Sequence, residues 1–68
     1  MPKAFKNREW LIELRLRKKK ERADVAKDLG ISKDMVRKIE CGERTPRHDL
    51  AVRMADYYGF SWTRFHEG

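Results

Sequence analysis

The residue types most often used in catalysis and metal binding are scarce and scattered in this chain. Its two histidines, His48 and His66, have no cysteine or histidine nearby at metal-ligand spacing. The sequence has no Gly-rich phosphate loop, and its carboxylates share charged stretches with Arg or Lys. Cys41 is the only cysteine and cannot form an intramolecular disulfide, which is typical of a reducing cytoplasm. We therefore expect that this protein is not an enzyme and that it has no catalytic residue, no metal site and no cofactor.

Basic side chains are the chemistry that this sequence does supply. Lys and Arg number 17 against 11 Asp and Glu, which gives a formal net charge of +6. Such an excess attracts polyanions, and nucleic acid is the first candidate partner. Much of the excess lies in one run, made of Arg15, Arg17, Lys18, Lys19, Lys20 and Arg22. For Lys18 to Lys20 the sequence leaves two alternatives open, a DNA contact or a solvated helix face.

The length and patterning of the chain indicate its class. Its 68 residues suffice for one domain, which we expect to span residues 1–68. Apolar residues make up 40% and recur at helical spacing, which excludes disorder. No stretch approaches the roughly 20 apolar residues that span a bilayer, and the first residues lack the apolar core of a signal peptide. We expect a compact, all-α, cytoplasmic protein.

The first half of the chain predicts two helices. Apolar residues within 10–14 share one face of a helix that has Asn7 as its N-cap and ends within residues 18–20. The second helix begins at about Arg22 and ends at Gly30, which can adopt the left-handed conformation of a helix terminus.

The second half predicts three more. Ser32 is the N-cap of a third helix that runs to Gly42. After a loop over residues 43–47, a fourth apolar stripe covers residues 50–58. A last helical turn has Ser61 as its N-cap, so the sequence predicts five helices in all.

Residues 22–40 carry the most informative pattern. They form two short helices joined by a turn at Gly30, where Ala26 permits a close approach and Val36 fills the space between the helices. Two helices that cross at roughly 90–120° through a turn containing glycine form a helix-turn-helix unit, whose second helix enters the DNA major groove.

Several motifs occur in order along most of the chain, from about Arg8 to Phe65. They are Asp24-Val-Ala-Lys-Asp-Leu-Gly-Ile-Ser32; Ile39-Glu40-Cys41-Gly42 with Arg44 and Pro46; Leu50-Ala51 with Met54-Ala55; and Gly59-Phe-Ser-Trp62 with Phe65. In these motifs the sequence resembles the Cro/repressor family of phage and bacterial regulators, also called the Xre family. The resemblance implies a compact five-helix, lambda-repressor-like helix-turn-helix domain that binds double-stranded DNA and regulates transcription. Glu21 and Arg22 stand where the family usually has Ser or Thr followed by Gln.

Base contacts are expected from the outer face of the third helix, opposite Val36 and Ile39. Arg and Lys suit the O6 and N7 acceptors of guanine, and a carboxylate can accept from the N4 amino group of cytosine. The candidates are Lys33, Asp34, Arg37 and Lys38. The alternative is an ordinary solvated face, and Asp34 also suits the positive end of the helix dipole.

Phosphate contacts are expected from residues at helix starts and in the loop. Arg22 would act together with the free N–H groups of the second helix. The candidates are Arg22, Ser32, Arg44 and Arg47. The resemblance also implies that the loop arginines reach toward the minor groove at a dimer centre.

The resemblance assigns Arg15 and Glu40 a structural role. Each occupies a position where the family places one partner of an ion pair that links the first helix to the end of the third. We expect this pair to hold the fold together, so Glu40 is not a general base.

The expected partner is an operator with inverted-repeat half-sites, bound by a homodimer that forms in solution or on the DNA. The dimer surface would include the loop over residues 43–47 and the surroundings of Trp62. We expect a repressor of phage or mobile-element type. The alternative is an antitoxin or protein-interaction module that uses the same fold to bind a partner protein, with Tyr57 as the candidate exposed aromatic residue. Binding to a membrane surface ranks last, because Trp10 and Leu14 are needed in the core.

Overall fold

The computed structural model describes residues 6–66, and its described residues form helices and loops with no strand. Four α-helices, α1 (Glu9–Arg17), α2 (Arg22–Leu29), α3 (Lys33–Glu40) and α4 (His48–Tyr58), are followed by a short 3-10 helix, η1 (Trp62–His66). The all-helical prediction is confirmed, but the prediction of five helices is wrong, because the described residues form four α-helices. The last segment has only five residues, and its Arg64 amide bonds the Ser61 carbonyl three positions back (3.0 Å), as in a 3-10 turn.

In the helix-turn-helix segment, α2 begins and ends and α3 begins where the sequence predicts, but α3 ends at Glu40, two residues before the predicted Gly42. Gly30 follows α2 with φ of 69° and ψ of 34°, a left-handed conformation that L side chains rarely adopt. Ser32 then caps α3, because its Oγ accepts a hydrogen bond from the Met35 amide at 3.0 Å. The sharp turn between α2 and α3 is therefore fixed by local chemistry.

The start of α1 differs from the prediction. Its N-cap is Arg8 and has no side-chain cap, so the assignment of Asn7 as N-cap is wrong. Tertiary contacts decide the path here, since the Arg8 amide donates to the Glu40 carbonyl at the end of α3 (2.7 Å). Gly42 has φ of 80°, and a Cβ at this position would collide with the backbone carbonyl of Lys6. The segment before α1 thus lies directly against the end of α3.

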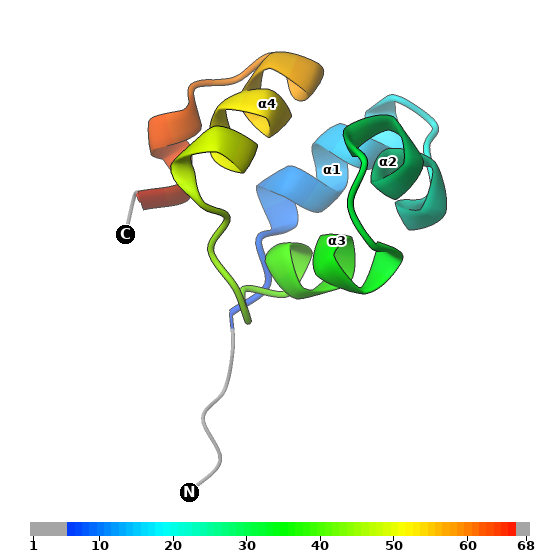
Figure 1. Cartoon of the computed structure of the whole chain (residues 1–68), viewed down its shortest axis with the longest axis horizontal. Coiled ribbons are helices and arrows are strands. Elements are labelled where there is room, and N and C mark those ends of the chain that lie inside the picture. The colour runs from blue at the N-terminus through cyan, green and yellow to red at the C-terminus, as the bar shows by residue number, and fades with distance from the viewer. Residues whose placement is uncertain (1–5, 67–68) are drawn as a thin grey trace, which may run out of the picture.

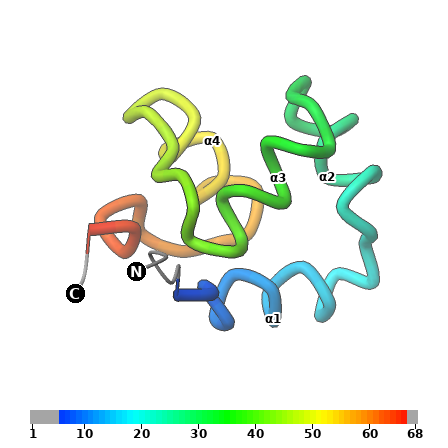
Figure 2. Tube along the Cα trace, turned by 90° about the horizontal axis from the view of Figure 1, so that it is seen from below, coloured from blue at the N-terminus to red at the C-terminus, as the bar shows by residue number. Residues whose placement is uncertain are grey.

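Figure 1 shows how the helices are arranged. Helices α2 and α3 lie together on one side, α4 and η1 lie on the other, and α1 runs between the two groups. Seen from below in Figure 2, α3 lies in the middle of the view, with α2 to one side and α4 to the other. The outer face of α3 is therefore presented on one side of the molecule.

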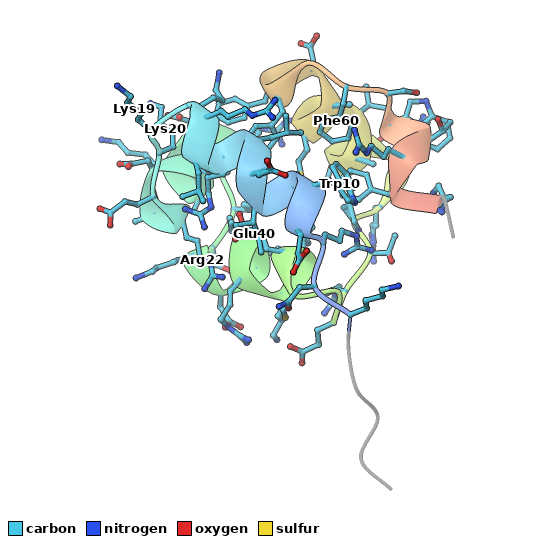
Figure 3. All side chains as sticks on the ribbon, turned by 180° about the vertical axis from the view of Figure 1, so that it is seen from behind. Trp10, Lys19, Lys20, Arg22, Glu40 and Phe60 are labelled. Carbon is cyan, nitrogen blue, oxygen red and sulfur yellow. The ribbon has the colours of Figure 1, made fainter. Side chains whose placement is uncertain are left out.

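An aromatic cluster joins the start of α1 to the C-terminal segment. The Trp10 ring lies 5.0 Å from that of Phe60 and 5.5 Å from that of Phe65, between centroids. Figure 3 shows Trp10 and Phe60 pointing toward each other across this interface. The guanidinium carbon of Arg64 lies over the Trp10 ring, 4.5 Å from its centroid.

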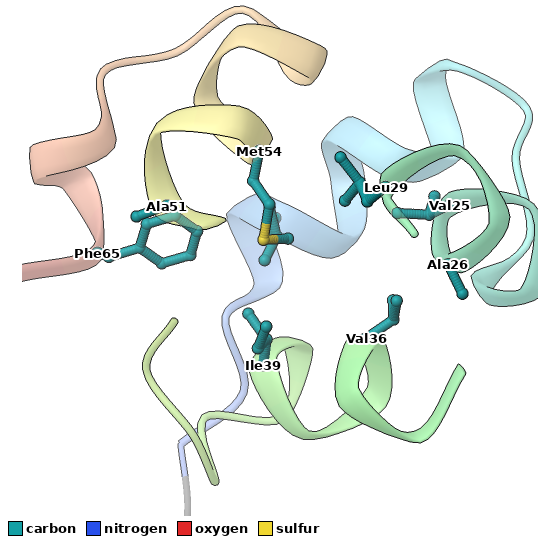
Figure 4. Packing of buried hydrophobic residues seen from close by; sticks show 9 residues of the cluster. Val25, Ala26, Leu29, Val36, Ile39, Ala51, Met54 and Phe65 are labelled. Carbon is teal, nitrogen blue, oxygen red and sulfur yellow. The ribbon is translucent and has the colours of Figure 1, made fainter. Parts of the chain in front are cut away.

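The core is built from the inward stripes of all four α-helices. Leu11, Val25, Val36, Ile39 and Met54 are completely buried and come from all four of them. Figure 4 shows Met54 of α4 reaching toward the side chains of α2 and α3. Each such side chain contributes about 1.5–3 kcal/mol of burial free energy, so this shared core holds α3 in place.

Candidate nucleic-acid interface

The four base-contact candidates lie on the side of α3 that faces away from the core. Val36 and Ile39 are fully buried on the inner side. Among the candidates, Lys33, Asp34 and Arg37 are exposed and Lys38 is half-buried. An exposed helix face of this kind can enter the DNA major groove.

The sequence analysis did not predict the ion pairs that lie within this face. One carboxylate oxygen of Asp34 lies 2.9 Å from Nη2 and 3.0 Å from Nε of Arg37, and the other lies 3.3 Å from Nζ of Lys38. Hydrogen bonds from Arg37 and Lys38 hold the pKa of Asp34 below its usual range, and the bond to Asp34 raises the pKa of Arg37. Glu43 in the following loop approaches Arg37 from the other side, with its carboxylate 3.7 Å from Nη1. Arg37 and Lys38 follow Asp34 by three and four residues, a helical spacing from which these ion pairs could have been predicted.

A buried carboxylate joins two arginines behind the interface. Glu40 is completely buried, and its two oxygens lie 2.6 Å from Nε of Arg15 and 2.9 Å from Nε of Arg22. Arg15 also donates to the Lys20 carbonyl at 3.0 Å. Figure 3 shows Arg22 and Glu40 on the same side of the molecule, next to α3. The second partner, Arg22, was not anticipated, because a separation of 18 residues leaves no local pattern to read.

A basic hollow opens beside this cluster, at the first turns of α2 and α3. It encloses about 370 Å³ and is lined by Arg15, Glu21, Arg22, Ala23 and Lys33. Its lining provides three cationic side chains and the Glu21 carboxylate, and Glu40 binds two of these cations, Arg15 and Arg22, through Nε only. An anion such as a phosphate group suits this environment.

The remaining phosphate candidates have separate surroundings. Ser32 uses its hydroxyl to cap α3, as described above. Arg44 and Arg47 are exposed in the loop, and within residues 6–66 no ion pair involves either of them. The loop itself is held by Arg8, a role that the sequence analysis did not predict.

Arg8 connects the segment before α1 to the loop. Its guanidinium donates to the carbonyls of Ile39 (2.5 Å) and Arg44 (2.9 Å) and to the hydroxyl of Thr45 (3.0 Å). It also lies 5.4 Å from the ring centroid of Phe65. One side chain therefore fixes the position of the loop that follows α3.

The lysines of the α1–α2 turn point elsewhere. Lys20 Nζ lies 3.5 Å from the Asp28 carboxylate, and Lys18 Nζ lies 4.9 Å from the ring centroid of Tyr57. Figure 3 shows Lys19 and Lys20 at the edge of the molecule away from α3. These lysines lie outside the α3 interface, and this placement favours a solvated face over a DNA contact.

Tyr57, the predicted exposed aromatic residue, is half-buried. Its hydroxyl donates to Asp28 at 2.6 Å. Desolvation, followed by this hydrogen bond, raises the pKa of Tyr57 to about 12.

Two other kinds of functional feature are absent from residues 6–66. That part of the chain has no group of three His, Cys, Asp or Glu side chains placed to bind a metal ion. None of its helices has the length and apolar character needed to cross a membrane.

Comparison with known proteins agrees with this geometry. A family model described as a helix-turn-helix domain matches residues 11–66. No curated protein matches the chain, and no solved structure matches it either. The family match indicates a DNA-binding regulator and agrees with the motifs of the Cro/repressor type. With a paired α2 and α3, an outward α3 face and a family match over most of its length, the chain belongs to the helix-turn-helix domain family.

Proposed function

We propose that this protein is a sequence-specific transcription repressor of phage or mobile-element type, a single domain over residues 1–68 without catalytic activity. It binds operator DNA with α3 in the major groove. The observation that carries this proposal is the continuity between the exposed face of α3 and the basic hollow at the starts of α2 and α3. One surface thus offers groups for base edges next to groups for the backbone.

The base contacts divide by chemistry. Lys33 and Arg37 are donors that suit O6 and N7 of guanine, and Lys38 adds a cation farther along the same face. Asp34 can accept from the N4 amino group of cytosine if it exchanges its present partners.

The phosphate contacts position the domain. Arg22 uses only Nε for Glu40, so both of its Nη groups remain available for a backbone phosphate at the hollow. Ser32, Arg44 and Arg47 extend the contacts along the start of α3 and the loop. Such contacts strengthen binding to any sequence and fix the orientation of α3.

A lone helix-turn-helix reads only a few base pairs. A symmetric homodimer on inverted-repeat half-sites doubles the number of base pairs that are read. The partner would contact the end of α3, the loop over residues 43–47 and the surroundings of Trp62. The half-sites would lie about 34–36 Å apart, one helical turn of DNA.

The test is selection of bound sequences from a random pool of DNA duplexes. An inverted repeat with half-site centres about 10 base pairs apart is expected. Insertion of about five base pairs, half a helical turn, should then abolish cooperative binding. A pool without enrichment contradicts the proposed function, and a single enriched half-site unaffected by the insertion contradicts the dimer.

A further inference from the structure

The outer face of α3 carries its own counterions. Every guanidinium nitrogen of Arg37 faces a carboxylate, with Nε and Nη2 near Asp34 and Nη1 near Glu43. The other oxygen of Asp34 faces Lys38. The two acids, which we call the α3 carboxylates, thus surround the central cation of the face that would read DNA.

Helix stability does not explain this arrangement. Asp34 in the first turn does favour the helix dipole, but Ser32 already caps α3, and Val36 and Ile39 anchor it in the core. Glu43 lies in the loop beyond the end of α3, so the dipole gives no reason for a carboxylate there. All three side chains are well exposed, at 58% for Asp34, 44% for Arg37 and 37% for Glu43, and exposed ion pairs add little to folding.

The arrangement has a larger effect on binding to DNA. A complex with random sequence is held by phosphate contacts, and there the α3 carboxylates repel phosphates and compete with them for Arg37. At an operator, guanine O6 and N7 offer Arg37 a bidentate replacement for its lost bonds, and Asp34 can accept from cytosine. The carboxylates therefore weaken non-specific binding more than specific binding.

On these grounds we propose that Asp34 and Glu43 are specificity determinants of the α3 interface, which hold Arg37 back from the DNA backbone and release it to a matching base pair. This proposal rests on the proposed function, because it assigns a further role to residues of the same DNA-binding surface.

The test uses Asp34→Asn and Glu43→Gln, which remove one charge each while keeping the shape. Binding to the selected operator and to a random duplex is measured by fluorescence anisotropy over a range of salt concentrations. We expect each variant to bind random DNA more tightly, with a log–log salt slope steeper by up to about 0.9, as for one more phosphate contact. The ratio of operator to random affinity should fall by about fivefold or more, the lower range for one base contact.

Glu13→Gln is the matched control. Glu13 is an exposed helical carboxylate that pairs with Arg17 at 3.7 Å on α1, outside the α3 interface. An equal fall in the affinity ratio in this control would mean that only net charge matters, and the proposal would be overturned. Circular dichroism establishes that each variant is folded, and Glu43→Gln, in the loop, keeps the test valid if Asp34→Asn weakens α3.

The outcomes separate the two proposals. A wild-type protein that enriches no DNA sequence refutes the proposed function and this inference together. A wild-type protein that selects an operator, with affinity ratios unchanged in both variants, leaves the proposed function standing and refutes only the role of the α3 carboxylates.

Discussion

Replacing Arg15 tests whether the buried carboxylate is shared by two arginines. Arg15→Met removes the 2.6 Å bond to Glu40 and the donor to the Lys20 carbonyl. A buried charge left with no partner costs about 3–5 kcal/mol. Arg22 remains bonded to Glu40 at 2.9 Å and retains part of that stabilisation. We therefore expect a loss of about 2–4 kcal/mol in the free energy of unfolding.

Such a loss is large for this chain. At about 0.05–0.15 kcal/mol per residue, a domain of this size has a total stability of roughly 3–10 kcal/mol. Each kcal/mol lost lowers Tm by about 4–8 °C in domains of 60–100 residues. Thermal and urea denaturation followed by circular dichroism will measure the change.

The double variant Arg15→Met, Arg22→Met distinguishes a shared carboxylate from two independent contacts. Arg22 is about one-third exposed, so its loss alone should cost less, about 1–2 kcal/mol. Losing both leaves Glu40 buried with neither arginine, and the combined loss should exceed the sum of the single losses by about 1 kcal/mol or more. Arg15→Met with Glu40→Leu should instead recover part of the loss. Strict additivity in the first double variant and no recovery in the second would refute the reasoning.

Three further predictions concern DNA binding and pH. Arg22→Ala should weaken binding to all DNA sequences alike and make the log–log salt slope shallower by about 0.9, as measured by anisotropy; loss at the operator alone would contradict a phosphate contact. Arg37→Ala or Lys33→Ala should relax the preference at one base position per half-site and cost about 1–3 kcal/mol on the operator with little loss on random DNA; equal losses would indicate phosphate contacts only. Desolvation, followed by the bond to Asp28, raises the pKa of Tyr57, and this contributes stability that is complete below pH 10 and is lost as pH rises through about 12. Absorbance titration should therefore show a step near 12 that Tyr57→Phe removes, and a step at the ordinary value of 10 would contradict a desolvated, hydrogen-bonded hydroxyl.

The parts of the fold that the sequence predicted depend on neighbours in the chain. The turn at Gly30, the cap at Ser32 and the inward positions of Val36 and Ile39 follow from conformational preference and helical periodicity. The short 3-10 ending and the uncapped start at Arg8 were not predicted, because packing against distant segments decides them.

The candidate site divides in the same way. Periodicity alone placed Lys33, Asp34 and Arg37 on the outer face of α3. The helical spacing of three residues is enough to predict the pair of Asp34 with Arg37, whereas the approach of Glu43 depends on the path of the loop. The bond from Arg22 to Glu40 joins residues 18 positions apart, and a side chain's choice among distant partners is set only by the finished fold.

The contacts of Arg8 also have a consequence for the order of folding. Its bonding partners Ile39, Arg44 and Thr45 follow it by 31 to 37 positions, whereas α2 and α3 meet across a turn of only a few residues. Contacts between near neighbours in the chain cost less loop entropy and form sooner than contacts between distant segments. We therefore expect the pairing of α2 with α3 to precede the closure of the loop by Arg8. Helix α3 is then complete while Arg44 and Arg47 still sample many positions. The final placement of these two arginines depends on the packing of the segment that carries Arg8 against the end of α3.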